Sequence, residues 1–215
     1  MPEKPEKVQL FHTCLINEFY PEVAMSVVNV LDRLGIQVEV PFDQTCCGQP
    51  AFNAGFFEEA RKIAAKTLEI LLDKEGPIII PSGSCGDMII HHYPVLFSDD
   101  SILLSKVNSV TERCYEFTQF LVDVLGITDL ESRLEAKGAY HPSCHLLRGL
   151  SVEDQSKRLL ENIAGLEVVE FGDQEECCGF GGMFSVKNPE ISGRMMNNKI
   201  DHLEAAEAEM VICCD

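Results

Sequence analysis

The chain has 215 residues, of which 46% are hydrophobic, and its 17 basic and 35 acidic residues give a formal net charge of −18. This charge argues against nucleic acids and acidic membrane surfaces as partners, because both bind through clustered lysines and arginines. The length suits one domain of two halves with ample core.

The N-terminal stretch, residues 1–7, is charged and has no apolar segment, so no secretory signal peptide is predicted. The longest apolar runs, such as residues 77–81, have the size of a strand and are too short to cross a bilayer. We therefore expect a cytoplasmic protein with no membrane span.

In the first half, strands alternate with helices. Apolar residues recur at helical spacing before a stop at Gly35, and Pro21 suits a first helical position. The expected strands are 8–11, 38–40 and 78–80, and the expected helices are 21–34 and 56–72. Strands that are apolar on both faces and separated by helices predict a parallel α/β sheet.

The second half repeats this order, with strands at 139–141, 168–171 and 210–212 and helices at 152–163 and after Asn188-Pro189. Ser151 and Asp154 resemble a capping box at the start of the first of these helices. The sequence predicts an α/β fold of two pseudo-symmetric Rossmann-like half-domains with parallel sheets, produced by an internal duplication.

Residues 86–137 have no counterpart in the second half. They connect the halves and include a helix predicted over 111–125, which ends at Gly126. Cys114 falls on the apolar face of this helix, so we expect it to pack in the core as a small hydrophobic residue.

A Cys-Cys-Gly motif occurs twice, at 46–48 and at 177–179. A lone cysteine precedes each copy, Cys14 at a gap of 46 − 14 = 32 and Cys144 at a gap of 177 − 144 = 33. The two pairs are offset by 178 − 47 = 131 positions. A repeat of this length indicates a duplicated half-domain rather than a solenoid.

Cys85 closes the first copy. The same offset places its counterpart at 85 + 131 = 216, one position beyond Asp215, so the second copy is expected to lack its last cysteine. We predict a first repeat over 1–95, a connecting helical segment over 96–137 and a second repeat over 138–215.

In each half, every motif cysteine follows the end of a predicted strand. Parallel α/β sheets bind ligands at the carboxyl edge of their strands, so each half is expected to gather one cysteine cluster there. Reduced cytosolic thiolates select zinc, copper(I) or iron–sulfur clusters. The C-x2–4-C knuckles of zinc ribbons are incomplete here, and adjacent cysteines suit a larger cluster than a single ion. We predict an iron–sulfur cluster, with zinc or a metal-free dithiol as alternatives.

These motifs resemble the cysteine-rich CCG domain family, which occurs in heterodisulfide reductase and in the iron–sulfur subunits of glycolate and glycerol-3-phosphate oxidising enzymes. Within it, the chain is most similar to the lactate-utilisation protein A group. The stretches that carry the resemblance are 13–15, 19–21, 45–51, 81–85, 115–118 and 177–187.

The resemblance implies an iron–sulfur redox subunit of a cytoplasmic L-lactate dehydrogenase complex that oxidises lactate to pyruvate. Its implied partners are lactate-utilisation proteins B and C. Its implied cofactor is a 4Fe-4S cluster, cubane or non-cubane, and its implied ligands are Cys14, Cys46, Cys47, Cys85, Cys144, Cys177, Cys178 and Cys213.

The chain departs from the family pattern, which ends each repeat in C-x-x-C. Ser82 stands at the earlier of these positions in the first repeat; in the second, Cys213 fits it and Cys214 is extra. No linear ferredoxin motif is present, which favours a subunit that exchanges electrons with a partner. A heterodisulfide-reductase-like thiol–disulfide enzyme and a zinc-stabilised scaffold remain as rival functions.

Other polar residues near the motifs have two interpretations each. His12, His141 and His145 either form hydrogen bonds or transfer protons at the clusters, or they fill loops. The glycines of 179–182 either let the backbone approach a cluster or cradle a phosphate, although the P-loop lysine is absent. His91-His92 is expected to lie at the surface end of a helix.

Overall fold

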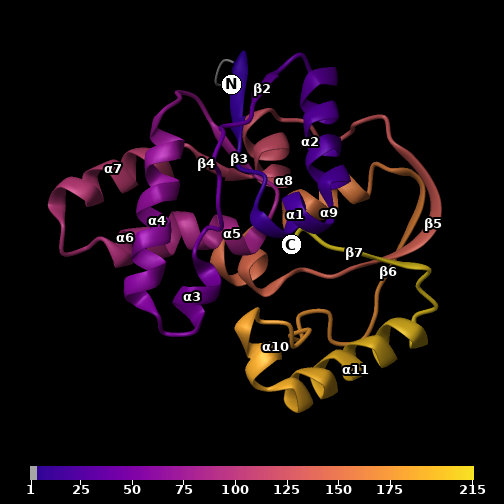
Figure 1. Cartoon of the computed structure of the whole chain (residues 1–215). Coiled ribbons are helices and arrows are strands. Elements are labelled where there is room, and N and C mark those ends of the chain that lie inside the picture. Colours follow the sequence, from indigo (N-terminus) through magenta and orange to yellow (C-terminus); the bar gives the residue numbers. More distant parts are fainter. Residues whose placement is uncertain (1–3) are drawn as a thin grey trace.

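The computed structural model describes residues 4–215, and its first half is built on a four-stranded parallel sheet (Figure 1). The strand order is β2-β1-β3-β4. The strands are β1 (Lys7–Leu10), β2 (Gln37–Glu39), β3 (Ile78–Ile80) and β4 (Cys114–Glu116). The helices of this half are α1 (Cys14–Phe19), α2 (Pro21–Arg33), α3 (Gln49–Asn53), α4 (Phe57–Leu72), α5 (Gly83–Asp87), α6 (Tyr93–Leu96), α7 (Ser101–Thr111) and α8 (Phe117–Gln119), with π-helical turns η1 (Met88–His92) and η2 (Phe120–Val124).

Helices cover both faces of this sheet, because its strands are apolar on both sides. Ile78 and Ile80 of β3 point into a cluster of buried residues with α4, α6 and α7, whereas Ile79 points into a second cluster with α2. In Figure 1, α4 and α2 accordingly lie on opposite sides of the strands. All three isoleucines are fully buried. Side-chain alternation along one short strand thus holds both layers of helices.

The second half contains a three-stranded parallel sheet with the order β6-β5-β7. Its strands are β5 (Arg133–Tyr140), β6 (Ala164–Val169) and β7 (Met210–Ile212). Its helices are the π-helical turn η3 (His145–Gly149), α9 (Asp154–Leu160), α10 (Met183–Lys187) and α11 (Pro189–Ala205). The predicted α/β fold with parallel sheets in two halves is confirmed, and β7 has the predicted bounds.

Two local predictions are wrong. The helix expected over 111–125 is replaced by the end of α7, strand β4, helix α8 and turn η2. Cys114 is buried, as expected, but it lies on β4, which pairs with β3. Ser151 and Asp154 form no capping box: Glu153 occupies the N-cap of α9 without a side-chain hydrogen bond, and Ser151 has φ 56°.

The two halves meet through residues that the repeat relates to each other. The Gly83 amide donates to the carbonyl of Cys214 at 2.9 Å, and 83 + 131 = 214. The Ser84 amide donates to Oδ1 of Asp215 at 2.9 Å, and 84 + 131 = 215. Ser82 caps α5 by accepting from the Cys85 amide at 3.3 Å. The end of β7 therefore packs against the start of α5.

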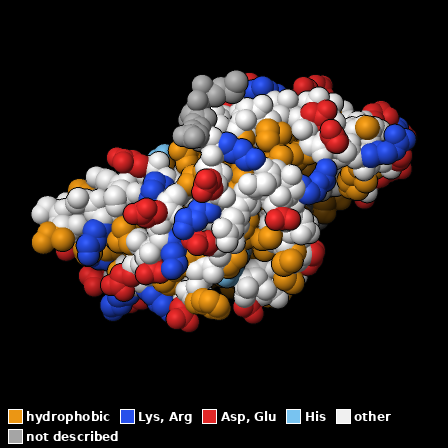
Figure 2. Space-filling model, turned by 90° about the horizontal axis from the view of Figure 1, so that it is seen from above, with side chains coloured by type: hydrophobic (Ala, Val, Ile, Leu, Met, Phe, Trp, Pro, Cys, Tyr) orange, Lys and Arg blue, Asp and Glu red, His pale blue; other side chains and the backbone are white. Residues whose placement is uncertain are grey.

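Acidic and basic side chains are interspersed on the face shown in Figure 2, with hydrophobic side chains between them. This face carries no basic patch of the kind that binds polyanions. Within residues 4–215, no helix combines the length and apolar character that a bilayer span requires.

Candidate functional site

The first cysteine site lies at the carboxyl edge of the first sheet. Cys14 begins α1 after β1, Cys46 and Cys47 occupy the loop after β2, and Cys85 lies in α5 after β3. Because β2, β1 and β3 are neighbours in the sheet, the three loops meet at one edge. Cys47 and Cys85 are buried, with 2% and 7% of their surface exposed.

The thiols of this site interact with one another. Contacts with the thiols of Cys14 and Cys47 lower the pKa of Cys46 to about 3. The same contact with Cys46, together with burial, raises the pKa of Cys14. Contacts with Cys46 and Cys85 raise the pKa of Cys47. The Gly48 amide also lies 3.4 Å from the Cys46 sulfur, so negative charge concentrates on Cys46.

Buried polar side chains support the backbone of the cysteine pair. The Tyr93 hydroxyl donates to the carbonyl of Cys47 at 2.8 Å, and the Thr67 hydroxyl donates to that of Cys46 at 3.4 Å. Tyr93 is fully buried and Thr67 is 1% exposed. Burial also raises the pKa of Tyr93, which keeps its hydroxyl protonated and able to donate.

The second cysteine site forms in the same way at the edge of the second sheet. Cys144 precedes η3, and Cys177 and Cys178 lie in the loop after β6. Burial and the neighbouring Cys177 raise the pKa of Cys144. All three cysteines are partly exposed. The Gly179 amide lies 3.4 Å from the Cys177 sulfur, matching Gly48 in the first site.

The cysteines that follow β7 are placed differently from Cys85, which follows β3. Cys213 is exposed, and its sulfur lies 3.6 Å from the Asp215 carbonyl. Cys214 lies 3.5 Å from the Ser156 hydroxyl instead, and burial with the nearby Glu116 raises its pKa to about 12. The structure thus places Cys177 and Cys178 close enough to influence Cys144, whereas the recorded contact of the Cys213 sulfur is with the Asp215 carbonyl.

The glycine of each Cys-Cys-Gly motif lies against the following long helix. A Cβ at Gly48 would lie 3.3 Å from the carbonyl oxygen of Ala60 on α4, and a Cβ at Gly179 would lie 2.7 Å from that of Ser192 on α11. Both glycines have positive φ, +90° and +83°. The helix contacts are equivalent, since 192 − 60 = 132. Glycine is therefore needed here for helix packing as well as for the approach of its amide to sulfur.

Asp87 connects the two halves. Its carboxylate lies 2.9 Å from Nδ1 of His91 and 2.6 Å from Nδ1 of His145, which follows Cys144. Burial opposes ionisation of Asp87, but the hydrogen bonds from His145 and His91 hold its pKa below the usual range. A Cβ at Gly149 would lie 2.5 Å from this carboxylate, so only glycine leaves room for it. His92 stacks on Phe52 at 4.7 Å between ring centroids.

A buried lysine lies beside the second site. Lys199 of α11 is 4% exposed, donates to the carbonyl of Gln174 at 2.9 Å and lies 3.2 Å from Nδ1 of His141. Burial lowers the pKa of Lys199, and the neighbouring Cys178 and Glu176 act against this decrease. Burial and Lys199 together lower the pKa of His141.

Sequence reasoning considered the histidines but missed the polar residues that hold the sites. His141 and His145 make specific contacts, whereas Nδ1 of His12 meets only the carbonyl of Thr13, at 3.1 Å. The missed residues are Thr67, Asp87, Tyr93 and Lys199. The available signal was a polar residue among apolar neighbours, as at Thr67 on the buried face of α4, but the partners of these residues lie far away in the sequence.

The donor set suits a thiophilic centre. All the clustered side chains are thiols, which select zinc, copper(I) or iron–sulfur, and amide N–H groups point at one sulfur in each site. Within residues 4–215, no three His, Cys, Asp or Glu side chains surround a common position for a single metal ion.

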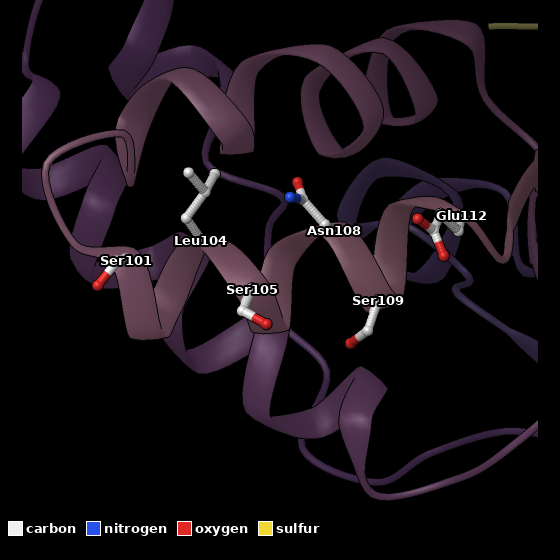
Figure 3. A pocket seen from close by; sticks show the side chains of 6 residues that line it. All are labelled: Ser101, Leu104, Ser105, Asn108, Ser109 and Glu112. Atoms are coloured by element: carbon white, nitrogen blue, oxygen red, sulfur yellow. The ribbon is translucent and has the colours of Figure 1, made fainter.

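Two surface hollows lie outside the cysteine sites. One runs along α7 and is lined by side chains of that helix, including Ser105 and Asn108, and by Glu112 directly after it (Figure 3). The other lies between Phe57, Arg61 and Val95. Neither is lined by a cysteine.

The fold and the paired thiol sites define a duplicated, cysteine-rich α/β protein. The chain belongs to the cysteine-rich domain family CCG, whose model matches residues 8–90 and 138–215. It is 43% identical over 209 residues to lactate utilization protein A 2 of Bacillus cereus (strain 03BB102), an alignment that covers 97% of this chain and 86% of the relative. It is 44% identical over 209 residues to lactate utilization protein A of Geobacillus kaustophilus (strain HTA426), covering 97% of this chain and 87% of the relative.

Proposed function

We propose that this chain is an iron–sulfur redox subunit of a cytoplasmic complex that oxidises L-lactate to pyruvate. The observation that carries the proposal is the set of four interacting thiols at the edge of the first sheet, repeated as three in the second half. The names of the relatives support lactate utilisation as the process. The partners in this proposal are lactate-utilisation proteins B and C.

The proposed ligands are the motif cysteines of each half: Cys14, Cys46, Cys47 and Cys85 in the first, and Cys144, Cys177, Cys178 and Cys213 in the second. A 4Fe-4S centre, cubane or non-cubane, would supply one-electron transfer when bound. Oxidation of lactate to pyruvate releases two electrons and two protons, so two centres in one chain match the number of electrons.

The chain's own residues hold and shield the thiols. Tyr93 and Thr67 fix the carbonyls of the first cysteine pair, and the glycine amides donate to sulfur in both halves. Asp87 joins the segment that follows Cys85 to the segment that follows Cys144 through His145. Such polar partners around a thiolate centre orient its ligands and tune its potential.

The test is the metal and acid-labile sulfide content of the anaerobically purified full chain, with a visible absorption spectrum. We expect iron and sulfide in matching amounts, and absorption that bleaches on reduction. Zinc without sulfide would overturn the redox role, because zinc has no redox chemistry. The lactate assignment is tested separately, by adding L-lactate and proteins B and C and recording reduction of the iron. Disulfide reduction with reduced viologen, without lactate-dependent reduction, would replace it by the thiol–disulfide alternative.

A further inference from the structure

Large apolar side chains are exposed beside the first cysteine site. Leu15 and Phe19 of α1 and Tyr20 directly after it each expose more than half of their surface, and Phe42 in the loop after β2 exposes 93%. No residue of α1 is buried. We call Leu15, Phe19, Tyr20 and Phe42 the apolar surface. Large apolar side chains that gather in solvent mark a place where another molecule binds.

Gln44 joins the two segments that carry these side chains. Its Oε1 accepts from the amide of His12 at 3.2 Å, and its Nε2 donates to the carbonyls of Leu10 at 2.9 Å and Pro41 at 3.0 Å. The loop that holds Phe42 therefore lies against the segment that leads from β1 into α1. Because β1 and β2 are paired in parallel, α1 and this loop leave the same edge of the sheet.

The apolar surface borders the exposed part of the first cysteine site. Cys14 directly precedes Leu15, and Cys46 lies in the same loop as Phe42. Both of these cysteines are partly exposed, whereas the other two of the site are buried. A molecule that covers the apolar surface would therefore approach the thiols from the side on which they reach solvent.

The repeat shows that the fold does not need these aromatic side chains. The lone cysteines of the two halves are offset by 144 − 14 = 130 positions, which relates Phe19 to Gly149. The cysteine pairs are offset by 178 − 47 = 131 positions, which relates Phe42 to Asp173. The second half thus forms its equivalent segments without aromatic residues at these positions. Packing within the chain does not account for Phe19 and Phe42, and binding does.

The charged residues around the apolar surface are acidic. Residues 12–26 and 40–47 contain Glu18, Glu22 and Asp43 and no lysine or arginine. All three carboxylates are exposed, and within residues 4–215 none of them belongs to an ion pair. Acidic neighbours argue against a second copy of the same surface, which would bring like charges together, and against an anionic lipid surface. They are complementary to a protein with basic residues.

We propose that the apolar surface binds an electron-transfer protein that presents apolar side chains surrounded by lysines and arginines. The proposal deepens the proposed function and rests on it for the kind of partner. Aromatic anchors at the centre of an interface carry much of its binding energy, and complementary charges at its rim speed association. A partner bound here lies against Cys14 and Cys46, the thiols of the first site that reach solvent.

The test uses lactate-utilisation proteins B and C as probes, each titrated separately into the full chain by isothermal titration calorimetry. We expect one of them to bind, and Phe42→Ser and Phe19→Ser each to weaken its affinity about tenfold or more. Ile102→Ser is the matched control, because it replaces a side chain of α7 that is 72% exposed, and it should leave the affinity unchanged. Urea unfolding should show little change in stability for all three variants, since the replaced side chains lie in solvent.

Asp43→Lys tests the complementarity of charge. It should slow association about threefold or more and make the association rate less sensitive to salt, because a rim charge acts mainly on the rate of encounter. Glu112→Lys, which makes the same change of charge at the end of α7, is its control and should alter neither quantity. A faster association in Asp43→Lys would mean that the partner is acidic and would contradict the proposal.

Binding of neither probe, or an unchanged affinity in both phenylalanine variants, would overturn the proposal. Sedimentation that shows a dimer of this chain, separated by Phe42→Ser, would make a second copy the occupant instead. Binding to vesicles of phosphatidylcholine and phosphatidylglycerol, lost in Phe42→Ser, would make it a lipid surface. Failure of the proposed function is seen separately, in the iron and sulfide content. A chain without iron that still binds through Phe42 would keep the docking surface and lose the redox role.

Discussion

The two cysteine sites share a motif but differ in what surrounds it. In the first, Cys47 and Cys85 are buried, and the two clusters of buried apolar residues are drawn entirely from residues 8–125. In the second, Cys144, Cys177 and Cys178 are all partly exposed, and the offset of the two helix contacts, 192 − 60 = 132, relates Lys199 of α11 to Thr67 of α4. The cysteines of the first site are thus packed into the hydrophobic core, whereas those of the second site are partly exposed to solvent. The duplication fixed the thiols and the glycine, and left the supporting residues free to diverge.

The largest effect expected from this difference concerns the cysteine pairs themselves. Cys47→Ser should abolish metal binding at the first site and lower the free energy of unfolding by about 3 kcal/mol or more, because ligation energy is folding energy and the serine is buried. Cys178→Ser should remove metal from the second site with a stability loss of only about 1 kcal/mol, because its side chain stays partly hydrated. Metal analysis and urea unfolding measure both.

Cys114→Ala is the control for these variants, since Cys114 is a buried thiol outside both sites. It should cost roughly 1–2 kcal/mol of packing and leave the metal content unchanged. Loss of metal in this variant would show that the sites have been wrongly delimited.

For the glycines of the two motifs, substitution should destabilise the second half more than the first, the opposite of the order expected for the cysteines. In Gly179→Ala the new methyl group would lie 2.7 Å from the Ser192 carbonyl oxygen and 2.9 Å from Cβ of Met195, at a positive φ, so we expect about 3 kcal/mol of destabilisation. In Gly48→Ala the nearest atom is 3.3 Å away, and about 1–2 kcal/mol is expected. Equal losses of unfolding free energy in the two variants, measured by urea unfolding, would mean that α11 shifts to make room for the methyl group at position 179 at little cost.

A third prediction concerns pH and the junction between the halves. Glu116 of β4 is buried, and burial raises its pKa to about 7 from 4.5. Between these values the folded chain holds a proton that the unfolded chain has lost, so the contribution of Glu116 to stability falls as pH rises from 4.5 to 7 and is constant above. The unmodified protein should lose about 3 kcal/mol more than Glu116→Gln over this range. Parallel stability–pH curves for the two proteins would contradict the buried, protonated carboxyl group.

The smallest loss of stability is expected when the hydrogen bond from Tyr93 to the carbonyl of Cys47 is removed. Tyr93→Phe removes the donor to the Cys47 carbonyl and should cost about 1–2 kcal/mol, because that carbonyl is left buried without its partner. Tyr140→Phe is the comparison in the second half, where the hydroxyl is buried without a hydrogen-bond partner. This variant should be neutral or slightly stabilising. A larger loss in Tyr140→Phe than in Tyr93→Phe would show that the hydrogen bond to the Cys47 carbonyl contributes little to stability.

Many of the helices and strands could be predicted from the sequence, because they depend on local patterns of apolar residues and prolines. Strand β7 and helix α11 follow from an apolar run and from Asn188-Pro189, and the burial of Cys114 follows from its apolar neighbours. Strand β4 was not predicted, because the apolar residues that follow it, Phe117, Leu121 and Val124, recur at helical spacing and imitate a helix that includes it.

The supporting contacts of the site were out of reach for a different reason. Asp87 meets His145, and Lys199 meets His141, across 58 positions in each case. No local pattern specifies such pairs, since the first depends on how the two halves pack together and the second on how α11 packs against the loop after β5. The positions of the candidate ligands could therefore be predicted from the cysteine motifs, but the charged residues around them could be identified only from the three-dimensional structure.

The hydrogen bond from Gly83 to Cys214 joins two positions that the duplication made equivalent. Between separate copies of a half, such a contact would lie close to a twofold axis, and its strength would depend on protein concentration. Covalent fusion replaces that dependence with a fixed effective concentration, so the pairing survives dilution. Fusion also allows the two halves to have different sequences, whereas the subunits of a homodimer are always identical. A substitution such as threonine to lysine can then enter one half alone, which no homodimer allows.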